Sequence, residues 1–76
     1  MLKTLTEMQV DEWGTISTLD GGKGLSEKLD NMSLYIGKEI KLISKHSRKG
    51  PVIIKVGNTQ IAIGFGIAQK IFIEAK

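Results

Sequence analysis

In the second half of the chain, apolar side chains recur at every second position. Ile40 and Leu42 begin this alternation, and residues 52–56 and 59–63 continue it. The two later segments flank Gly57-Asn58, a dipeptide typical of tight turns. Because successive side chains of a strand point to opposite faces of a sheet, the alternation predicts antiparallel strands with one buried face.

The first half of the chain is predicted to contain one strand and one short helix. Residues 13–19 are rich in β-branched side chains, which favours a strand. A glycine cluster at 21–24 ends this strand. Leu25, Leu29 and Met32 then follow at a spacing that places all three on one face of a short helix.

Shorter segments complete the expected order. Thr6 is predicted to cap a single opening turn, residues 33–37 to form a turn, and residues 64–68 to form an irregular or 3₁₀ stretch before a last strand over 70–74. Five short strands with one helical connection cannot form a parallel sheet, because parallel connections are long. We therefore expect a mainly β fold, a small SH3-like five-stranded barrel with one short helix after the first strand. A five-stranded OB barrel is the alternative, with its helix between strands three and four.

The same periodicities predict the buried side chains. Residues at period-two or helical spacing are expected to point inward, whereas the alternate residues, such as Ile53 and Phe72, point outward. The predicted core is Ile16, Leu29, Ile40, Leu42, Val52, Ile54, Val56, Ile61, Ile63, Ile71 and Ile73.

Length and composition indicate a single domain over residues 1–76. The chain has no cysteine, which favours a reducing, cytoplasmic environment, because small secreted domains usually depend on disulfides. No run approaches the ~20 apolar residues that span a bilayer, so membrane insertion is not expected.

The residue types give no support for catalysis or for a metal site. His46 is the only histidine and thiols are absent, so a nitrogen–sulfur metal site within one chain is excluded. The glycines at 21–24 lack the spacing of a phosphate-binding loop. We therefore expect no catalytic residue, no cofactor and no metal ligand within the chain. A metal that bridges two chains, and self-association, are left open.

Positive charge is concentrated in the middle of the chain. Residues 38–55 contain six Lys or Arg residues and one acidic residue, a net charge of +5, whereas the whole chain carries +3. Such a segment favours an acidic partner or a phosphate backbone, or it is the solvated face of a hairpin. Single-strand binders interleave aromatic residues for base stacking, and this segment has none. A small basic nucleic-acid-binding barrel is therefore the alternative to protein binding. The four aromatic residues of the chain are scattered and are expected to pack rather than to stack on bases: Trp13, Tyr35, Phe65 and Phe72.

Taken as a whole, the sequence resembles the FeoA family, small cytoplasmic proteins that accompany the ferrous iron transporter FeoB. The similarity runs from Leu5 to Ile73 and rests on the order and spacing of its elements. These are Leu5-Thr6-Glu7-Met8, Trp13-Gly14-Thr15-Ile16, the glycines at 21–24, Gly50-Pro51, the strand over 52–56 and Ile71-Phe72-Ile73. The family usually has glycine where this chain has Ser33, a difference that costs about 1 kcal/mol if the left-handed conformation is kept.

The resemblance implies an SH3-like barrel that is not an enzyme and that binds the cytoplasmic part of the Fe(II) transporter, thereby assisting iron uptake. The same domain occurs in iron- and manganese-dependent repressors, so a stand-alone relative of their C-terminal domain is a further alternative. Loops on a rigid barrel are the usual contact sites. The expected partner-binding residues are Met32, Leu34, Tyr35 and Ile36 in the post-helix turn, and Lys45, Arg48 and Lys49 in the hairpin loop. Alternatively, Leu34 and Ile36 only close the open end of the barrel.

Overall fold

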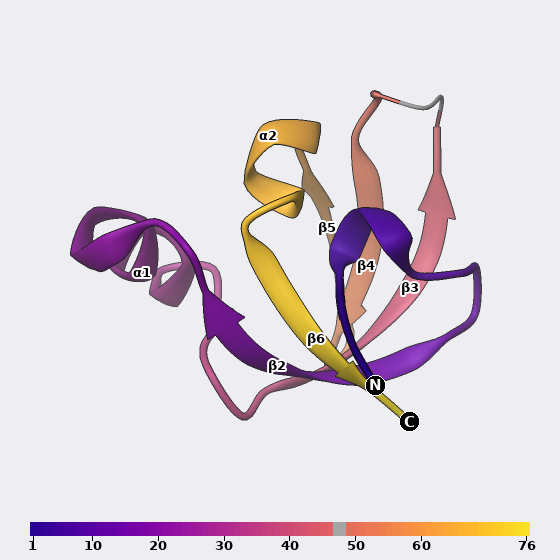
Figure 1. Ribbon diagram of the computed structural model, residues 1–76. Helices are drawn as coiled ribbons and strands as arrows, with labels where there is room; N and C mark the ends of the chain where they lie inside the picture. The colour runs from indigo at the N-terminus through magenta and orange to yellow at the C-terminus, as the bar shows by residue number, and fades with distance from the viewer. Residues whose placement is uncertain (47–48) are drawn as a thin grey trace.

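The computed structural model describes residues 1–46 and 49–76, which form one antiparallel sheet with short helices (Figure 1). The strands are β1 (Leu2–Thr4), β2 (Trp13–Leu19), β3 (Glu39–Lys45), β4 (Val52–Val56), β5 (Thr59–Ile63) and β6 (Ile71–Ala75). The helices are the 3₁₀ turn η1 (Leu5–Glu7), α1 (Gly22–Asp30) and α2 (Phe65–Ala68). The strands lie side by side in the order β1-β6-β2-β3-β4-β5, and every neighbouring pair is antiparallel.

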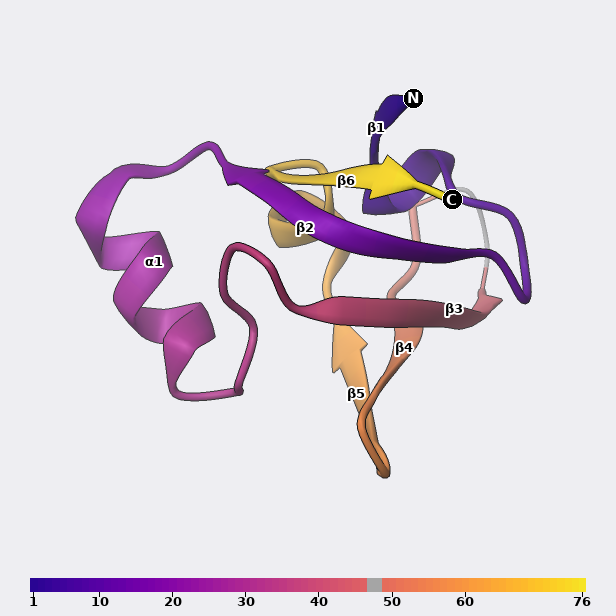
Figure 2. The ribbon, with the colours of Figure 1, turned by 90° about the horizontal axis from the view of Figure 1, so that it is seen from below.

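The sheet is strongly bent, so that β4 and β5 run across the direction of β2 and β3 (Figure 2). The register shifts between Ile16 and Thr18 where β2 pairs with β6, and between Leu42 and Ser44 where β3 pairs with β4. Irregularities of this kind bend a strand and increase its twist. The bend lets a six-stranded sheet wrap around its own apolar face, and the expected mainly β fold is confirmed.

Several expectations about the elements are wrong. The sheet has six strands and not five, because Leu2–Thr4 pairs with β6 as strand β1, and α1 consequently follows the second strand. A three-residue strand is too short to show an alternation, and its partner lies at the other end of the chain. The segment expected to be irregular or 3₁₀ contains the short α-helix α2. In addition, Thr4 and not Thr6 caps the opening turn, and the Thr4 backbone N–H donates to Glu7 Oε1 at 2.7 Å.

The core inside the bent sheet matches the predicted one closely. All predicted core residues are buried except Ile61, which is half-buried against them. Ile53 and Phe72 from the alternate set are only half-buried, so the predicted strand faces are confirmed. Sequence periodicity missed four buried hydrophobic side chains that lie in or beside short elements: Leu5, Met8, Leu34 and Ala68.

The end of α1 is fixed by two backbone hydrogen bonds. The Leu34 N–H donates to the Leu29 carbonyl oxygen at 2.9 Å, and the Ser33 N–H donates to the Asp30 carbonyl oxygen at 3.0 Å. This is the pattern of a Schellman motif, which requires a left-handed residue, and Ser33 adopts a φ of 62°. Leu29 and Leu34 are both fully buried in the same core cluster. Among the helices of the described residues, none has the length and apolar content needed to cross a membrane.

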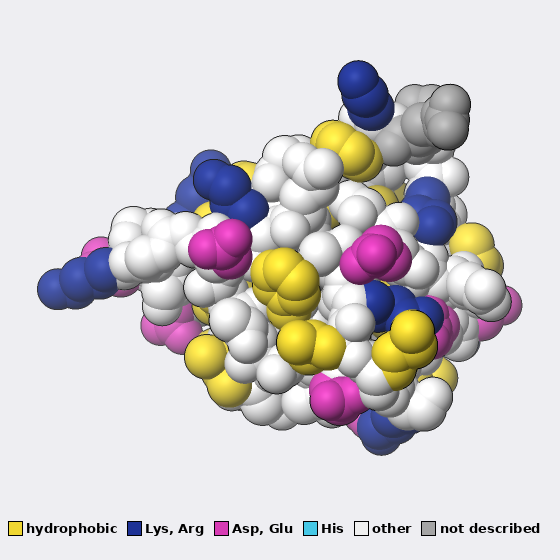
Figure 3. All heavy atoms as spheres, viewed as in Figure 1, with side chains coloured by type: hydrophobic (Ala, Val, Ile, Leu, Met, Phe, Trp, Pro, Cys, Tyr) yellow, Lys and Arg dark blue, Asp and Glu magenta, His cyan; other side chains and the backbone are white. Residues whose placement is uncertain are grey.

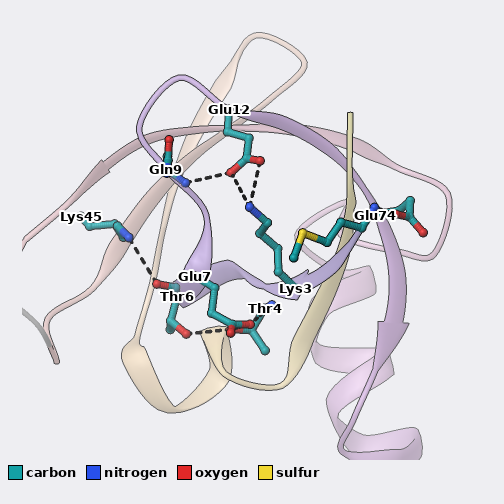
Figure 4. Close-up of polar contacts among 9 residues, drawn as sticks. Lys3, Thr4, Thr6, Glu7, Gln9, Glu12, Lys45 and Glu74 are labelled. Carbon is teal, nitrogen blue, oxygen red and sulfur yellow. Dashed lines mark hydrogen bonds and ion pairs between the residues drawn. The ribbon is translucent and has the colours of Figure 1, made fainter.

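A polar network fastens the N-terminal segment to the sheet (Figure 4). Lys3 Nζ lies 3.1 Å from Glu12 Oε2, and the Gln9 backbone N–H donates to Glu12 Oε1 at 2.9 Å. The Gln9 N–H, followed by the Lys3 ammonium, holds the pKa of Glu12 below its ordinary value of 4.5. Glu12 is therefore ionised at neutral pH and joins β1 to the loop that leads into β2.

Candidate partner-binding surfaces

The four residues of the turn after α1 that were expected to bind a partner differ in burial. Leu34 is fully buried and Met32 is half-buried, so both pack into the core. Tyr35 and Ile36 have 46% and 63% of their surface exposed. Leu34 thus belongs to the core of the barrel, and Tyr35 and Ile36 are the two residues of this cluster that are accessible to a partner.

The loop between β3 and β4 carries the basic part of the expected site. Lys45 and Lys49 are exposed, and Lys45 Nζ donates to the Thr6 carbonyl oxygen at 3.3 Å. Arg48, which was expected to contribute here, lies outside the described residues. His46 is exposed as well. Within residues 1–46 and 49–76, no three His, Cys, Asp or Glu side chains form a group that could hold a metal ion.

The turn and the loop do not form one continuous surface. The turn precedes β3 and the loop follows it, and Figures 1 and 2 show them at opposite ends of this strand. A strand of seven residues is roughly 23 Å long at about 3.3 Å per residue. A partner would therefore have to extend along all of β3 to touch both segments.

A second surface, which the sequence did not reveal, is centred on Trp13. β2 pairs with β3 so that Trp13 lies directly opposite Lys41, whose Nζ is 5.6 Å from the centroid of the indole ring. Just before β3 begins, Lys38 Nζ lies 5.8 Å from the centroid of the Tyr35 ring. Trp13 is 44% exposed, so the expectation that the aromatic residues pack is wrong for Trp13, whereas Tyr35, at 46% exposed, is accessible as its expected place in the partner-binding turn requires. The remaining two, Phe65 and Phe72, are half-buried.

Two open hollows meet at Trp13 and Glu39 on this surface. The smaller, of about 280 Å³, is also lined by Lys38, Lys55 and Gly57. The larger, of about 500 Å³, is also lined by Asp11, Glu12 and Lys76. We call the surface formed by Trp13, Lys38, Glu39, Lys41 and Lys55 the Trp13 face. It lies on the outer side of β2 and β3, the strands in front in Figure 2.

Charges on the Trp13 face are unevenly paired. Glu39 forms an ion pair with Lys76, and Lys41 Nζ lies 3.7 Å from Asp11 Oδ1. Within the described part of the chain, Lys38 and Lys55 form no ion pair with a carboxylate. The smaller hollow therefore carries two ammonium groups that form no ion pair with a carboxylate of residues 1–46 and 49–76.

The side that carries β6 and α1 has a different character. Figure 3 shows its hydrophobic side chains as separate small patches between acidic and basic groups. Scattered apolar side chains are normal on the surface of a small protein. We therefore find stronger indications of a binding surface on the Trp13 face and at the exposed turn.

Comparison with known protein families decides the classification. The model of the FeoA domain matches residues 3–75. The chain belongs to the FeoA family. A relative from Methanocaldococcus jannaschii, named as Fe(2+) transport protein A, is 39% identical over 59 residues, which are 78% of this chain and 70% of the relative.

Solved structures show the same fold. The crystal structure of an iron uptake regulatory protein (FeoA) matches with a TM-score of 0.90 and 32% identity over 100% of this chain and 99% of that protein. A manganese-dependent transcriptional repressor matches with a TM-score of 0.88 over 99% of this chain and 42% of its own, at 10% identity. The second likeness concerns the fold alone, and the expected SH3-like class is confirmed.

Proposed function

We propose that this protein is an accessory protein of ferrous iron uptake that binds, in the cytoplasm, the cytoplasmic part of an Fe(II) transporter of the FeoB type. The observation that carries the proposal is the match to the FeoA domain over residues 3–75, nearly the whole chain. The relative named for Fe(2+) transport supports the same role. The protein acts by binding and not by catalysis.

The distribution of exposed side chains supports a binding role. Exposed aromatic residues on a rigid frame are the residues that most often dominate the energy of a protein interface. Tyr35 and Trp13 are such residues, and both are held by the barrel. The basic β3–β4 loop adds positive charge, which mainly accelerates and orients the encounter with an acidic partner.

A titration of the protein against the isolated cytoplasmic domain of the transporter, at two salt concentrations, tests this function. We expect saturable binding that weakens at the higher salt concentration, because salt screens charge pairs at an interface. The absence of binding at both salt concentrations would contradict the proposed function.

Two variants test the residues expected at the turn and the loop. Tyr35→Ala should weaken binding with little effect on the melting temperature, because nearly half of this side chain is already exposed. Lys49→Glu should slow association and reduce its dependence on salt. If Tyr35→Ala binds as the wild type does, or mainly unfolds the protein, the turn is structural and makes no contact with the partner.

A further inference from the structure

The smaller hollow of the Trp13 face is assembled by strand pairing from distant parts of the sequence. Trp13 comes from β2, Lys38 from the segment that leads into β3, and Lys55 from β4. Lys41 is the direct cross-strand partner of both Trp13 and Lys55. Strand pairing therefore places Trp13, Lys41 and Lys55 in one row across β2, β3 and β4. The groups therefore stand on a hydrogen-bonded sheet, so that little ordering is needed when a ligand binds.

The chemistry of this hollow favours a carboxylate that has an apolar neighbour. Lys38 and Lys55 supply two ammonium groups, and no ion pair with a carboxylate of the described residues neutralises either. Glu39 also lines the hollow, but its charge is offset by Lys76. Trp13 adds an apolar wall that is 44% exposed.

We propose that this hollow binds an acidic peptide segment, with a carboxylate between Lys38 and Lys55 and an apolar side chain packed on Trp13. The inference rests on the proposed function, because the segment belongs to the cytoplasmic part of the transporter. The indole supplies the contact area that dominates affinity, and the two lysines select an acidic sequence and fix its register.

A single-stranded nucleic acid fits this face less well. A phosphate backbone that runs across the face meets Glu39 and, in the adjoining hollow, Asp11 and Glu12. Bases would have to stack on the aromatic rings, and Lys41 already lies over the Trp13 ring. A short segment that places one carboxylate in the smaller hollow stays clear of Asp11 and Glu12, and an apolar side chain can contact the indole without stacking on the whole ring.

Charge reversal tests the hollow. Lys38→Glu and Lys55→Glu are compared with Lys28→Glu, which changes the net charge equally but lies at an exposed position of α1. By calorimetry with the isolated cytoplasmic domain, each hollow variant should bind at least about tenfold more weakly, and Lys28→Glu should stay within about twofold of the wild type. Melting temperatures identify a variant that fails to fold, and the other hollow variant then decides. If all three variants lost the same affinity, the effect would be explained by net charge alone, and the proposal would be overturned.

A second measurement observes the hollow without the transporter. Trp13 is the only tryptophan of the chain, so its fluorescence reports on this surface. Poly-glutamate, which has no aromatic group, should change this fluorescence in the wild type and in Lys28→Glu but not in Lys55→Glu. If Lys55→Glu responds to poly-glutamate as strongly as the wild type does, the proposal is overturned. A stronger response of the wild type to oligothymidylate than to poly-glutamate would also overturn it, and would favour nucleic acid.

The two measurements separate the two hypotheses. If the cytoplasmic domain does not bind while the poly-glutamate response depends on Lys55, the proposed function fails and the acidic-peptide site stands. If the domain binds the wild type and both hollow variants equally, the site fails and the proposed function stands.

Discussion

Trp13 and Lys41 face each other directly across β2 and β3, and the Lys41 ammonium lies 5.6 Å from the centroid of the indole ring. Asp11 Oδ1 lies 3.7 Å from the same ammonium. The Lys41 ammonium therefore favours one orientation of the indole on the outer side of the sheet, although nearly half of Trp13 is exposed. A side chain that is already ordered loses little entropy when a partner covers it.

The left-handed conformation of Ser33 predicts a stabilising substitution. At a φ of 62° a glycine has no Cβ strain, so Ser33→Gly should raise the free energy of unfolding by about 0.5–1 kcal/mol. Urea denaturation measures this difference. The matched control is Ser26→Gly in the middle of α1, which should lower the free energy of unfolding by about 0.5–1 kcal/mol. A loss of stability in Ser33→Gly would contradict the assigned helix end.

A side chain at Gly14 is predicted to destabilise the protein for a steric reason. A Cβ at this position would lie 2.2 Å from Ile73 Cγ2 and 3.1 Å from the Glu74 carbonyl oxygen, where β2 and β6 approach closely. Gly14→Ala should therefore lower the free energy of unfolding by about 1–3 kcal/mol, measured by thermal or urea denaturation. Gly24→Ala in α1 meets no atom within 4 Å and should be neutral or stabilising. If the two variants were equally stable, β2 and β6 could move apart at Gly14 without a loss of unfolding free energy, and the steric prediction would be wrong.

The Glu12 network predicts how stability depends on pH. Folding lowers the pKa of Glu12 from its ordinary value of 4.5, so the unfolded chain binds this proton more readily than the folded one. The contribution of the ionised Glu12 to the free energy of unfolding is complete above pH 4.5. It is lost as the pH falls through the lowered pKa of Glu12 in the folded state. Glu12→Gln should show a smaller loss of unfolding free energy over this acidic range. Parallel pH profiles for the wild type and Glu12→Gln would contradict the role of the network.

The periodic part of the fold was predictable from the sequence. Alternation at Ile40 and Leu42, and helical spacing at Leu25 and Leu29, placed apolar side chains on the correct faces, because local geometry alone decides which residues share a face. The three residues of β1 were missed, because they show no period and are defined only by pairing with β6.

The candidate site was less predictable, because it depends on strand register. Tyr35 and Ile36 are predicted as partner-binding residues from an apolar turn, a local signal, and the structure shows that both are exposed. The basic middle segment contains no aromatic residue, and nothing in the sequence indicates that pairing brings Trp13 opposite Lys41. Trp13 alternates with buried Gly14 and Ile16, which was the one available sign that it points outward.

The side chains that could bind a metal ion are dispersed, which predicts weak metal binding by the monomer. With one histidine, no cysteine and no group of three ligand side chains in the described residues, we expect no Fe²⁺ or Zn²⁺ site of micromolar or tighter affinity. Calorimetry on a demonstrably monomeric sample measures this. A stoichiometric site at that affinity would show that this protein handles the ion itself.

The most direct test of the account is the rate of Fe(II) uptake by cells that encode this protein, measured with radioactive iron under reducing conditions. Cells that lack the protein but keep the transporter should take up Fe(II) more slowly. Wild-type protein should restore the rate, and Lys55→Glu should restore it less well than the Lys28→Glu control. An unchanged rate in cells without the protein would contradict its role as an accessory protein of ferrous iron uptake.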